Sequence, residues 1–322
     1  MSKRIDIVVC PDKWFVMPTG VMMRSVCVNN PDVNIVFHVI IDDSVTEGDK
    51  KDLRDVISAF KEKKVEFYHI DVSKFPCFPN LENKGFPPAT YYRLQTSQIL
   101  PSYLNKVLYL DGDVIVRHSL LPLWETDLTG YAVAAVPDCA EATAEFYVRL
   151  KYPQELGYFN SGVMLINLDY WRINGVEDEF MSFLTNRADD IYCHDQDVLN
   201  AVFKDRKIIL PIKYNLHHGF MWTSPKYDYQ KYKWELYEAL NDPTIIHFTG
   251  EKPWYAYRRN PQNPLSSSFF KYQSQTKWKG VKIDKRPLKR RVINLLADLL
   301  RRLGLKKPLD LPFTYRSIKP TD

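Results

Sequence analysis

Short apolar segments alternate with helix-like segments through the first part of the chain, and this order constrains the fold more than any other feature. Residues 5–10, 35–41 and 65–70 are typical of β-strands, because apolar and β-branched side chains dominate them. Residues 20–28 and 46–60, which lie between them, are typical of helices. A β-α-β-α-β order predicts an α/β fold with a mainly parallel sheet flanked by helices.

The rest of the chain continues this mixed pattern after a Pro-rich stretch at 76–88. The expected elements are a helix at 90–100, strands at 106–110, 131–136, 162–167 and 244–248, and a helix after Asp195. No repeat or low-complexity linker precedes residue 280. We therefore expect one α/β domain at 1–280 and a separate tail at 281–322.

Composition excludes several classes of protein. Apolar residues make up 45% of the chain, so disorder is excluded, and no apolar run has the roughly 18 to 20 residues of a transmembrane helix. The five cysteines contain no C-x-x-C pair, which predicts neither a disulfide framework nor a zinc knuckle. The first ten residues resemble a strand rather than a signal peptide, so a cytoplasmic protein is expected.

The positive charge is concentrated near the C-terminus. Residues 285–307 hold nine Lys or Arg and one Asp, a net +8, which leaves the other 299 residues at −3 within a total of +5. A nucleic-acid groove across the body is therefore not expected. Apolar residues at 288, 292, 295, 299 and 303 predict a basic amphipathic helix. It either lies on an anionic membrane surface or packs on the body.

Asp111-Gly112-Asp113 follows the apolar strand at 106–110 directly. Ligands of open α/β sheets bind outside the carboxyl ends of strands, which is where these acids lie. Alternate residues of an extended segment share a face, so both carboxylates can bind one hard divalent cation. The alternative is a solvated turn. A second D-x-D, Asp195 to Asp197, opens a helix-like run, where helix capping competes with a role in binding.

His247 ends the strand-like segment at 244–248 and is a third candidate ligand. A lone histidine at a strand end is usually structural. Here, however, Gly250 and Lys252 follow it, and a glycine and a lysine suit the approach of a phosphate.

Six segments along the chain form one ordered set. The segments are Asp12 after the first strand, A-T-Y-Y-R ending at Arg93, K-V-L-Y-L-D-G-D ending at Asp113, F-N-S-G-V-M-L-I-N at 159–167, D-Q-D-V-L-N at 195–200, and H-F-T-G-E-K-P-W at 247–254. Together they resemble family 8 of the retaining glycosyltransferases, which includes bacterial lipooligosaccharide galactosyltransferases, lipopolysaccharide glucosyltransferases and glycogenin. They occur in the family's order over about 250 residues.

The resemblance implies a GT-A fold, a UDP-galactose or UDP-glucose donor, and Mn²⁺, with Mg²⁺ as the alternative, held by Asp111, Asp113 and His247. The other donor-binding residues that it implies are Cys10, Asp12, Arg93, Gly112, Asn160, Asp195, Gln196, Gly250 and Lys252. Asp138 corresponds to an acid near the acceptor. The chain departs from the family in three places: Cys10 replaces the usual Ala, Trp14 replaces a polar residue, and one residue rather than two separates Gly250 from Lys252.

The expected activity is that of a metal-dependent retaining hexosyltransferase that builds a surface glycan, such as lipopolysaccharide, on a glycan or glycolipid acceptor. The resemblance puts Gln196, with Asp195 beside it, near the sugar face opposite the UDP. An amide is a poor nucleophile, so we expect front-face transfer rather than double displacement. A lipid-linked acceptor favours attachment of the tail to the inner face of the plasma membrane.

Two other functions remain open from the sequence. A sugar nucleotidyltransferase also surrounds a metal with acids, but it ordinarily has a Gly-rich phosphate loop near the first strand, which residues 10–13 do not provide. A catalytically inactive nucleotide- or glycan-binding module is the other, and intact Asp111, Asp113 and His247 argue against it.

Overall fold

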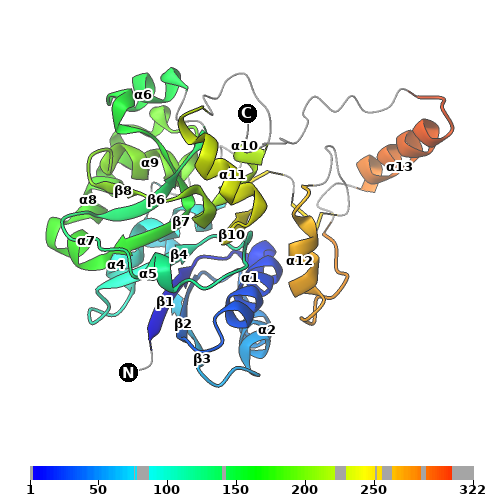
Figure 1. Cartoon of the computed structure of the whole chain (residues 1–322), viewed down its shortest axis with the longest axis horizontal. Coiled ribbons are helices and arrows are strands. Elements are labelled where there is room, and N and C mark those ends of the chain that lie inside the picture. The colour runs from blue at the N-terminus through cyan, green and yellow to red at the C-terminus, as the bar shows by residue number, and fades with distance from the viewer. Residues whose placement is uncertain are drawn as a thin grey trace.

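The computed structural model describes residues 3–75, 77, 87–139, 143–221, 230–250, 252–255, 263–283 and 288–306. A seven-stranded mixed sheet in the order β3-β2-β1-β4-β7-β6-β8 forms its centre. Its strands are β1 (Arg4–Val9), β2 (Asn34–Ile41), β3 (Lys63–His69), β4 (Lys106–Leu110), β6 (Val133–Pro137), β7 (Phe159–Asn167) and β8 (Lys207–Ile209). Figure 1 shows helices on both sides of this sheet.

The sheet is mainly parallel, as the sequence predicts. The pairs β1–β2, β2–β3, β1–β4 and β6–β8 are parallel, whereas β7 runs antiparallel to both of its neighbours, β4 and β6. In β4, Leu108 and Leu110 pack into one core, and Val107 and Tyr109 pack into the core on the opposite face. Burial on both faces explains why such strands are continuous apolar runs in the sequence.

Helices cover both faces of the large sheet. The helical elements are α1 (Val16–Asn29), α2 (Glu47–Ile57), α4 (Thr96–Ile99), α5 (Leu121–Trp124), α6 (Ala144–Leu150), α7 (Leu168–Asn174), α8 (Val176–Asn186), α9 (His194–Val202), α10 (His218–Met221), α11 (Lys233–Asn241), α12 (Ser266–Gln273) and α13 (Leu288–Arg302). A capping box between Thr46 and Asp49 fixes the start of α2.

A second, three-stranded sheet brings distant parts of the chain to the end of β4. Its order is β5-β10-β9, with β5 (Val114–Val116), β9 (Leu216–His217) and β10 (Ile245–His247). β10 pairs antiparallel with β5 and parallel with β9. The sequence pattern predicts β10 within the segment 244–248 but neither of its partner strands.

Two helical predictions differ from the structure. The helix expected at 90–100 is instead a 3₁₀ segment over Pro88–Gln95 followed by the single turn α4, and Leu100 is extended before Pro101, a residue that disfavours helix ahead of it. The helix expected at 20–28 begins at Val16, because Pro18 in a first helical turn loses no hydrogen bond.

The predicted amphipathic helix in the tail forms as α13, which lies apart from the body in Figure 1. Among the described residues, no helix combines the length and apolar character that a bilayer crossing requires. The Pro-rich stretch at 76–88 and the chain from 307 onward lie largely outside the described residues.

Candidate active site

The small sheet places His247 beside the two acids that follow β4. His247 pairs with Val114 in the β10–β5 ladder, and the Phe248 N–H donates to the Asp113 carbonyl at 3.0 Å. His247 Nε2 lies 3.2 Å from Asp113 Oδ1 and 3.5 Å from Asp111 Oδ2. Asp113 and His247 are buried. Three ligand atoms from two distant segments therefore converge, and they lie within 4.8 Å of one another.

Glycines permit this close approach. A Cβ at Gly162 in β7 would overlap the His247 imidazole and lie 2.7 Å from Asp111 Oδ2. A Cβ at Gly112 would overlap the Thr19 hydroxyl. Both positions therefore need glycine for packing rather than for a special backbone angle.

A chain of hydrogen bonds fixes the proton on His247. The Gly162 N–H donates to Asn160 Oδ1 at 3.1 Å, and a backbone N–H can only donate, so this amide oxygen is an acceptor. Asn215 Nδ2 donates to the same oxygen at 2.8 Å, which turns Asn215 Oδ1 toward His247 Nδ1 at 3.0 Å. Nδ1 must therefore carry a proton, which leaves Nε2, the ring nitrogen that faces the acids, as the atom that a metal ion could bind.

Lys252 pairs with Asp113. Its ammonium contacts Asp113 Oδ2 and donates to the Phe248 carbonyl at 2.6 Å. Burial by itself raises the pKa of Asp113, but the nearby Lys252 and His247 outweigh burial and hold this pKa well below the usual carboxyl value. The short spacing after Gly250 thus leaves the lysine in the site. Gly250 itself is exposed and lies near the His218 ring.

Arg93 links the D-x-D to Asp195. Its Nη2 lies 2.9 Å from Asp111 Oδ1, its Nε lies 3.3 Å from Asp195 Oδ2, and its guanidinium covers the Tyr109 ring at 4.3 Å. Ser161 Oγ donates to Asp195 Oδ2 at 3.0 Å. Burial raises the pKa of Asp195 to about 6, even though Arg93 opposes the shift.

Gln196 joins this network to Asp138. Gln196 Oε1 accepts from the Ser161 N–H at 3.0 Å, and its Nε2 donates to Asp138 Oδ2 at 3.2 Å. Asn160 Nδ2 donates to the same Asp138 oxygen at 2.9 Å. Both ends of the Gln196 amide are thus fixed, as is the carboxylate that faces it.

The second D-x-D is divided between two roles. Asp195 faces the site, but Asp197 is fully buried, pairs with Arg149 at 2.7 Å and accepts from the Tyr192 and Cys193 N–H groups. Of the two acids in this motif, Asp197 therefore has a structural role. Asp12, which follows β1, caps a short 3₁₀ turn by accepting from the Trp14 and Phe15 N–H groups.

A cavity of about 1010 Å³ connects these residues, large enough for a sizeable ligand. It is lined by every candidate that the sequence analysis names except Gly250: Cys10, Asp12, Arg93, Asp111, Gly112, Asp113, Asp138, Asn160, Asp195, Gln196, His247 and Lys252. Burial raises the pKa of Cys10 to about 12, so its thiol stays neutral. Sequence reasoning missed Asn215, which no motif marks, and it assigned no role to Ser161 or Gly162, which lie inside the quoted 159–167 segment.

The model of glycosyl transferase family 8 matches residues 6–257 of this chain. The chain belongs to glycosyl transferase family 8. General stress protein A of Bacillus subtilis is 28% identical over 86% of this chain and 96% of its own length. Lipopolysaccharide 1,2-glucosyltransferase of Escherichia coli K12 is 28% identical over 81% of this chain and 75% of its own.

Solved structures agree with this family membership. The galactosyltransferase LgtC, in complex with donor and acceptor sugar analogues, superposes with a TM-score of 0.72 at 25% identity, over 89% of this chain and 99% of its own. The fold is thus GT-A, and the chain is a glycosyltransferase. Such an enzyme takes a nucleotide-sugar donor and a glycan acceptor.

The buried Asp195 predicts a specific pH dependence of stability. Its pKa is about 6 in the folded protein against 3.8 for the ordinary carboxyl, so the folded state holds the proton more tightly. Its contribution to stability is therefore largest below about pH 4 and falls as the pH rises to about 6. At about 1.36 kcal/mol per pH unit this amounts to about 3 kcal/mol.

Urea unfolding of the wild type and Asp195→Asn between pH 4 and 7 checks this expectation. The wild type should lose stability relative to the variant as the pH rises, whereas Asp32→Asn, at an exposed carboxylate, should follow the wild type. Parallel profiles for the wild type and Asp195→Asn would contradict the elevated pKa.

Proposed function

We propose that this glycosyltransferase transfers a hexose, galactose or glucose, from a UDP-sugar to a surface glycan, with Mn²⁺ or Mg²⁺ at Asp111, Asp113 and His247. The observation that carries the proposal is the convergence of two carboxylates with an imidazole whose Nε2 faces them. Oxygen and nitrogen ligands of this kind suit these cations. The lipopolysaccharide glucosyltransferase among the relatives supports a hexose and a glycan acceptor.

The cation, when bound, would act as a Lewis acid that stabilises negative charge on the departing diphosphate. The chain's own residues prepare the site for it. Asn215 holds the His247 tautomer, and Gly162 leaves the space that the imidazole and Asp111 need. Lys252 neutralises Asp113 in the free protein, and we propose that its ammonium transfers to the diphosphate when the donor binds.

We propose that transfer retains the anomeric configuration by front-face attack. Both ends of the Gln196 amide are hydrogen-bonded, and an amide is a poor nucleophile. We therefore propose that Gln196 positions the donor sugar and does not attack it. Asp195 is buried and held by Arg93 and Ser161. The acceptor hydroxyl would then lose its proton to an oxygen of the leaving phosphate.

Front-face transfer predicts that no glycosyl-enzyme forms. Intact-mass spectrometry during turnover, and of Gln196→Glu and Gln196→Ala, should show only unmodified protein, with activity lowered in both variants. A glycosyl adduct mapped to Asp195 would establish double displacement instead.

The donor is tested by thermal unfolding with UDP-, GDP- and CMP-sugars, each with and without Mn²⁺. A ligand that binds only the native state raises the melting temperature, so UDP-galactose or UDP-glucose with Mn²⁺ should stabilise most. Stabilisation by GDP- or CMP-sugars but not by UDP-sugars would contradict the proposal that the donor is a UDP-sugar. Slow hydrolysis of the UDP-sugar in the same samples would show that the protein is an enzyme and not an inactive binding module.

Two variants, measured in the same thermal-unfolding experiment, separate the effect of losing a metal ligand from the effect of losing the residue that orients one. Asp113→Asn should lose the Mn²⁺-dependent stabilisation. Asn215→Ala keeps all three ligands but frees the imidazole, and it should weaken Mn²⁺ binding by about 10- to 100-fold, as loss of an outer hydrogen-bond partner does. Binding unchanged in both variants would place the cation elsewhere.

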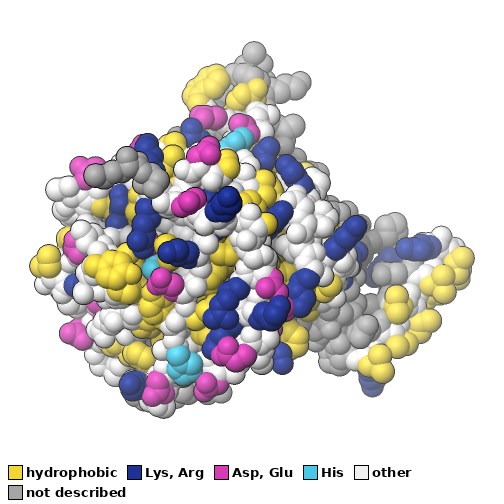
Figure 2. Space-filling model, turned by 90° about the horizontal axis from the view of Figure 1, so that it is seen from below, with side chains coloured by type: hydrophobic (Ala, Val, Ile, Leu, Met, Phe, Trp, Pro, Cys, Tyr) yellow, Lys and Arg dark blue, Asp and Glu magenta, His cyan; other side chains and the backbone are white. Residues whose placement is uncertain are grey.

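We also propose that α13 attaches the enzyme to an anionic membrane surface. The large apolar side chains of α13, and Leu303 directly after it, are all exposed: Leu288, Val292, Ile293, Leu295, Leu296, Leu299, Leu300 and Leu303. Figure 2 shows hydrophobic side chains gathered along this helix, with basic side chains near them. An exposed apolar face with flanking Lys and Arg suits the headgroup region of acidic lipids, and a lipid-linked acceptor would share that surface.

Vesicle co-sedimentation of the full chain tests this attachment. We expect binding to vesicles that contain phosphatidylglycerol, weakening with salt, and little binding to pure phosphatidylcholine. The double variant Leu295→Glu, Leu299→Glu should sediment much less, whereas Ile173→Glu, at an exposed site on α7, should bind as the wild type does. Equal sedimentation of all three proteins would contradict the proposal.

A further inference from the structure

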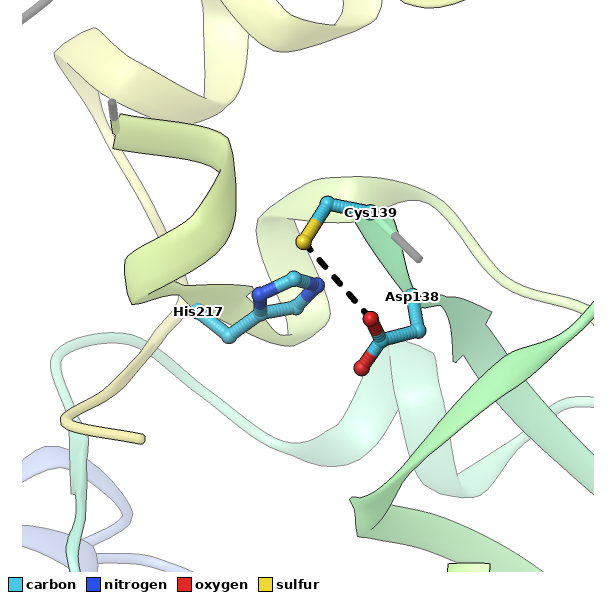
Figure 3. Close-up of side chains that lie close together, drawn as sticks. All are labelled: Asp138, Cys139 and His217. Atoms are coloured by element: carbon cyan, nitrogen blue, oxygen red, sulfur yellow. Dashed lines mark hydrogen bonds between the residues drawn. The ribbon is translucent and has the colours of Figure 1, made fainter. Parts of the chain in front are cut away.

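A second group of metal-ligating side chains lies at the end of β6, outside the Asp111, Asp113 and His247 cluster. Asp138 and Cys139 directly follow β6, and His217 ends β9. Figure 3 shows the carboxyl, the thiol and the imidazole directed toward one another. Their ligand atoms lie within 4.8 Å of one another. The proposed function uses neither Cys139 nor His217.

The packing around this group holds the thiol in place. A Cβ at Gly219 would overlap Cys139 Sγ and lie 3.2 Å from the His217 ring, so glycine leaves room for the sulfur beside the imidazole. His217 is 2% exposed and stacks on Phe220 with ring centres 4.3 Å apart. Its Nε2 makes one long contact, 3.3 Å, to the Pro137 carbonyl. The ring is fixed by packing more than by polar contacts.

The spacing of the sulfur and the carboxylate fits one small cation. Cys139 Sγ lies 3.6 Å from Asp138 Oδ1. With bonds of about 2.3 Å to sulfur and about 2.0 Å to oxygen, two ligands of a tetrahedral zinc ion lie about 3.5 Å apart. The imidazole completes three protein ligands, and a set of three leaves one position open.

Asp138 divides its two oxygens between this group and the cavity. Oδ1 faces Cys139, whereas Oδ2 accepts from Asn160 and Gln196. A cation on Oδ1 would therefore leave both Oδ2 hydrogen bonds intact, and these bonds would orient the carboxylate as an outer shell does in metal sites. His217 is also the ladder partner of His247, so the two groups are neighbours in the small sheet.

We propose that Asp138, Cys139 and His217 form a second cation site, selective for a soft divalent ion such as Zn²⁺, and that its occupation slows sugar transfer. Thiolate and imidazole ligands favour zinc, whereas the two carboxylates and the imidazole of the Asp111, Asp113 and His247 cluster suit manganese. On binding, the Cys139 S–H bond breaks, a sulfur–zinc bond forms and the proton goes to solvent. The effect on transfer rests on the proposed function and on the place near the acceptor that the family resemblance implies for Asp138.

Cobalt and zinc titrations of the full chain, freed of metal with a chelator, test the site without any activity measurement. Co²⁺ should bind with thiolate-to-cobalt charge-transfer absorption, and one equivalent of Zn²⁺ should abolish that absorption. The Asp111, Asp113 and His247 cluster contains no thiol, so this absorption does not report on it.

Matched variants assign the absorption to Cys139. Cys139→Ser should abolish it, and Gly219→Ala, which keeps every ligand but crowds the sulfur, should weaken Zn²⁺ binding by at least about 10-fold. Cys77→Ser, which replaces a half-buried thiol outside both groups, should match the wild type. Circular dichroism checks that each variant is folded. Absorption or affinity unchanged in both Cys139→Ser and Gly219→Ala would overturn the site.

A separate measurement tests the effect on catalysis. With Mn²⁺ and donor saturating, micromolar Zn²⁺ should inhibit transfer by the wild type, and Cys139→Ser should keep its Mn²⁺-dependent transfer and lose most of that inhibition. Inhibition that persists in Cys139→Ser would overturn the regulatory role. If the enzyme consumes no UDP-sugar at all, the proposed function is wrong. The cobalt absorption would still show whether the second cation site exists.

Discussion

The structure depends on holding two carboxylates and an imidazole close together inside the protein. Asp113 is buried, and both Asp113 and Asp111 lie beside Nε2 of His247. Burying like charges costs several kcal/mol per ion unless cations or hydrogen bonds compensate. Lys252 compensates Asp113, and Arg93 compensates Asp111 and Asp195. These three carboxylates thus outnumber the two cationic side chains, Arg93 and Lys252, that pair with them. The space between Asp111, Asp113 and His247 is therefore suited to one further cation.

Two parts of the fold build this arrangement. The large sheet brings the ends of β4 and β7 together, so that Asp111 and Gly162 lie side by side. The small sheet then joins β5 to β10 and places His247 over that edge. Hydrogen bonds from Gly162 through Asn160 and Asn215 to His247 cross between the two sheets. Through Asp138, the same network reaches Gln196.

The sequence predicts every strand of the central sheet except β8, and it predicts the connections less well. The strand at 106–110 is predicted with its exact ends, because a strand buried on both faces is a continuous apolar run bounded by polar residues. The 3₁₀ segment Pro88–Gln95 is not predicted, since periods of 3.0 and 3.6 cannot be separated over eight residues. Family resemblance names residues that the structure gathers around one cavity. Asn215 is not predicted, because its role depends on a hydrogen bond to His247, which is distant in the sequence, and no local sequence pattern marks it.

The most direct test of this account is a crystal grown with MnCl₂ and UDP and measured near the manganese absorption edge. We expect one anomalous peak within coordination distance of Asp111, Asp113 and Nε2 of His247, with the diphosphate beside it and Lys252 turned from Asp113 to a phosphate oxygen. A diphosphate bound without a peak at these three side chains, or manganese held only elsewhere, would contradict it.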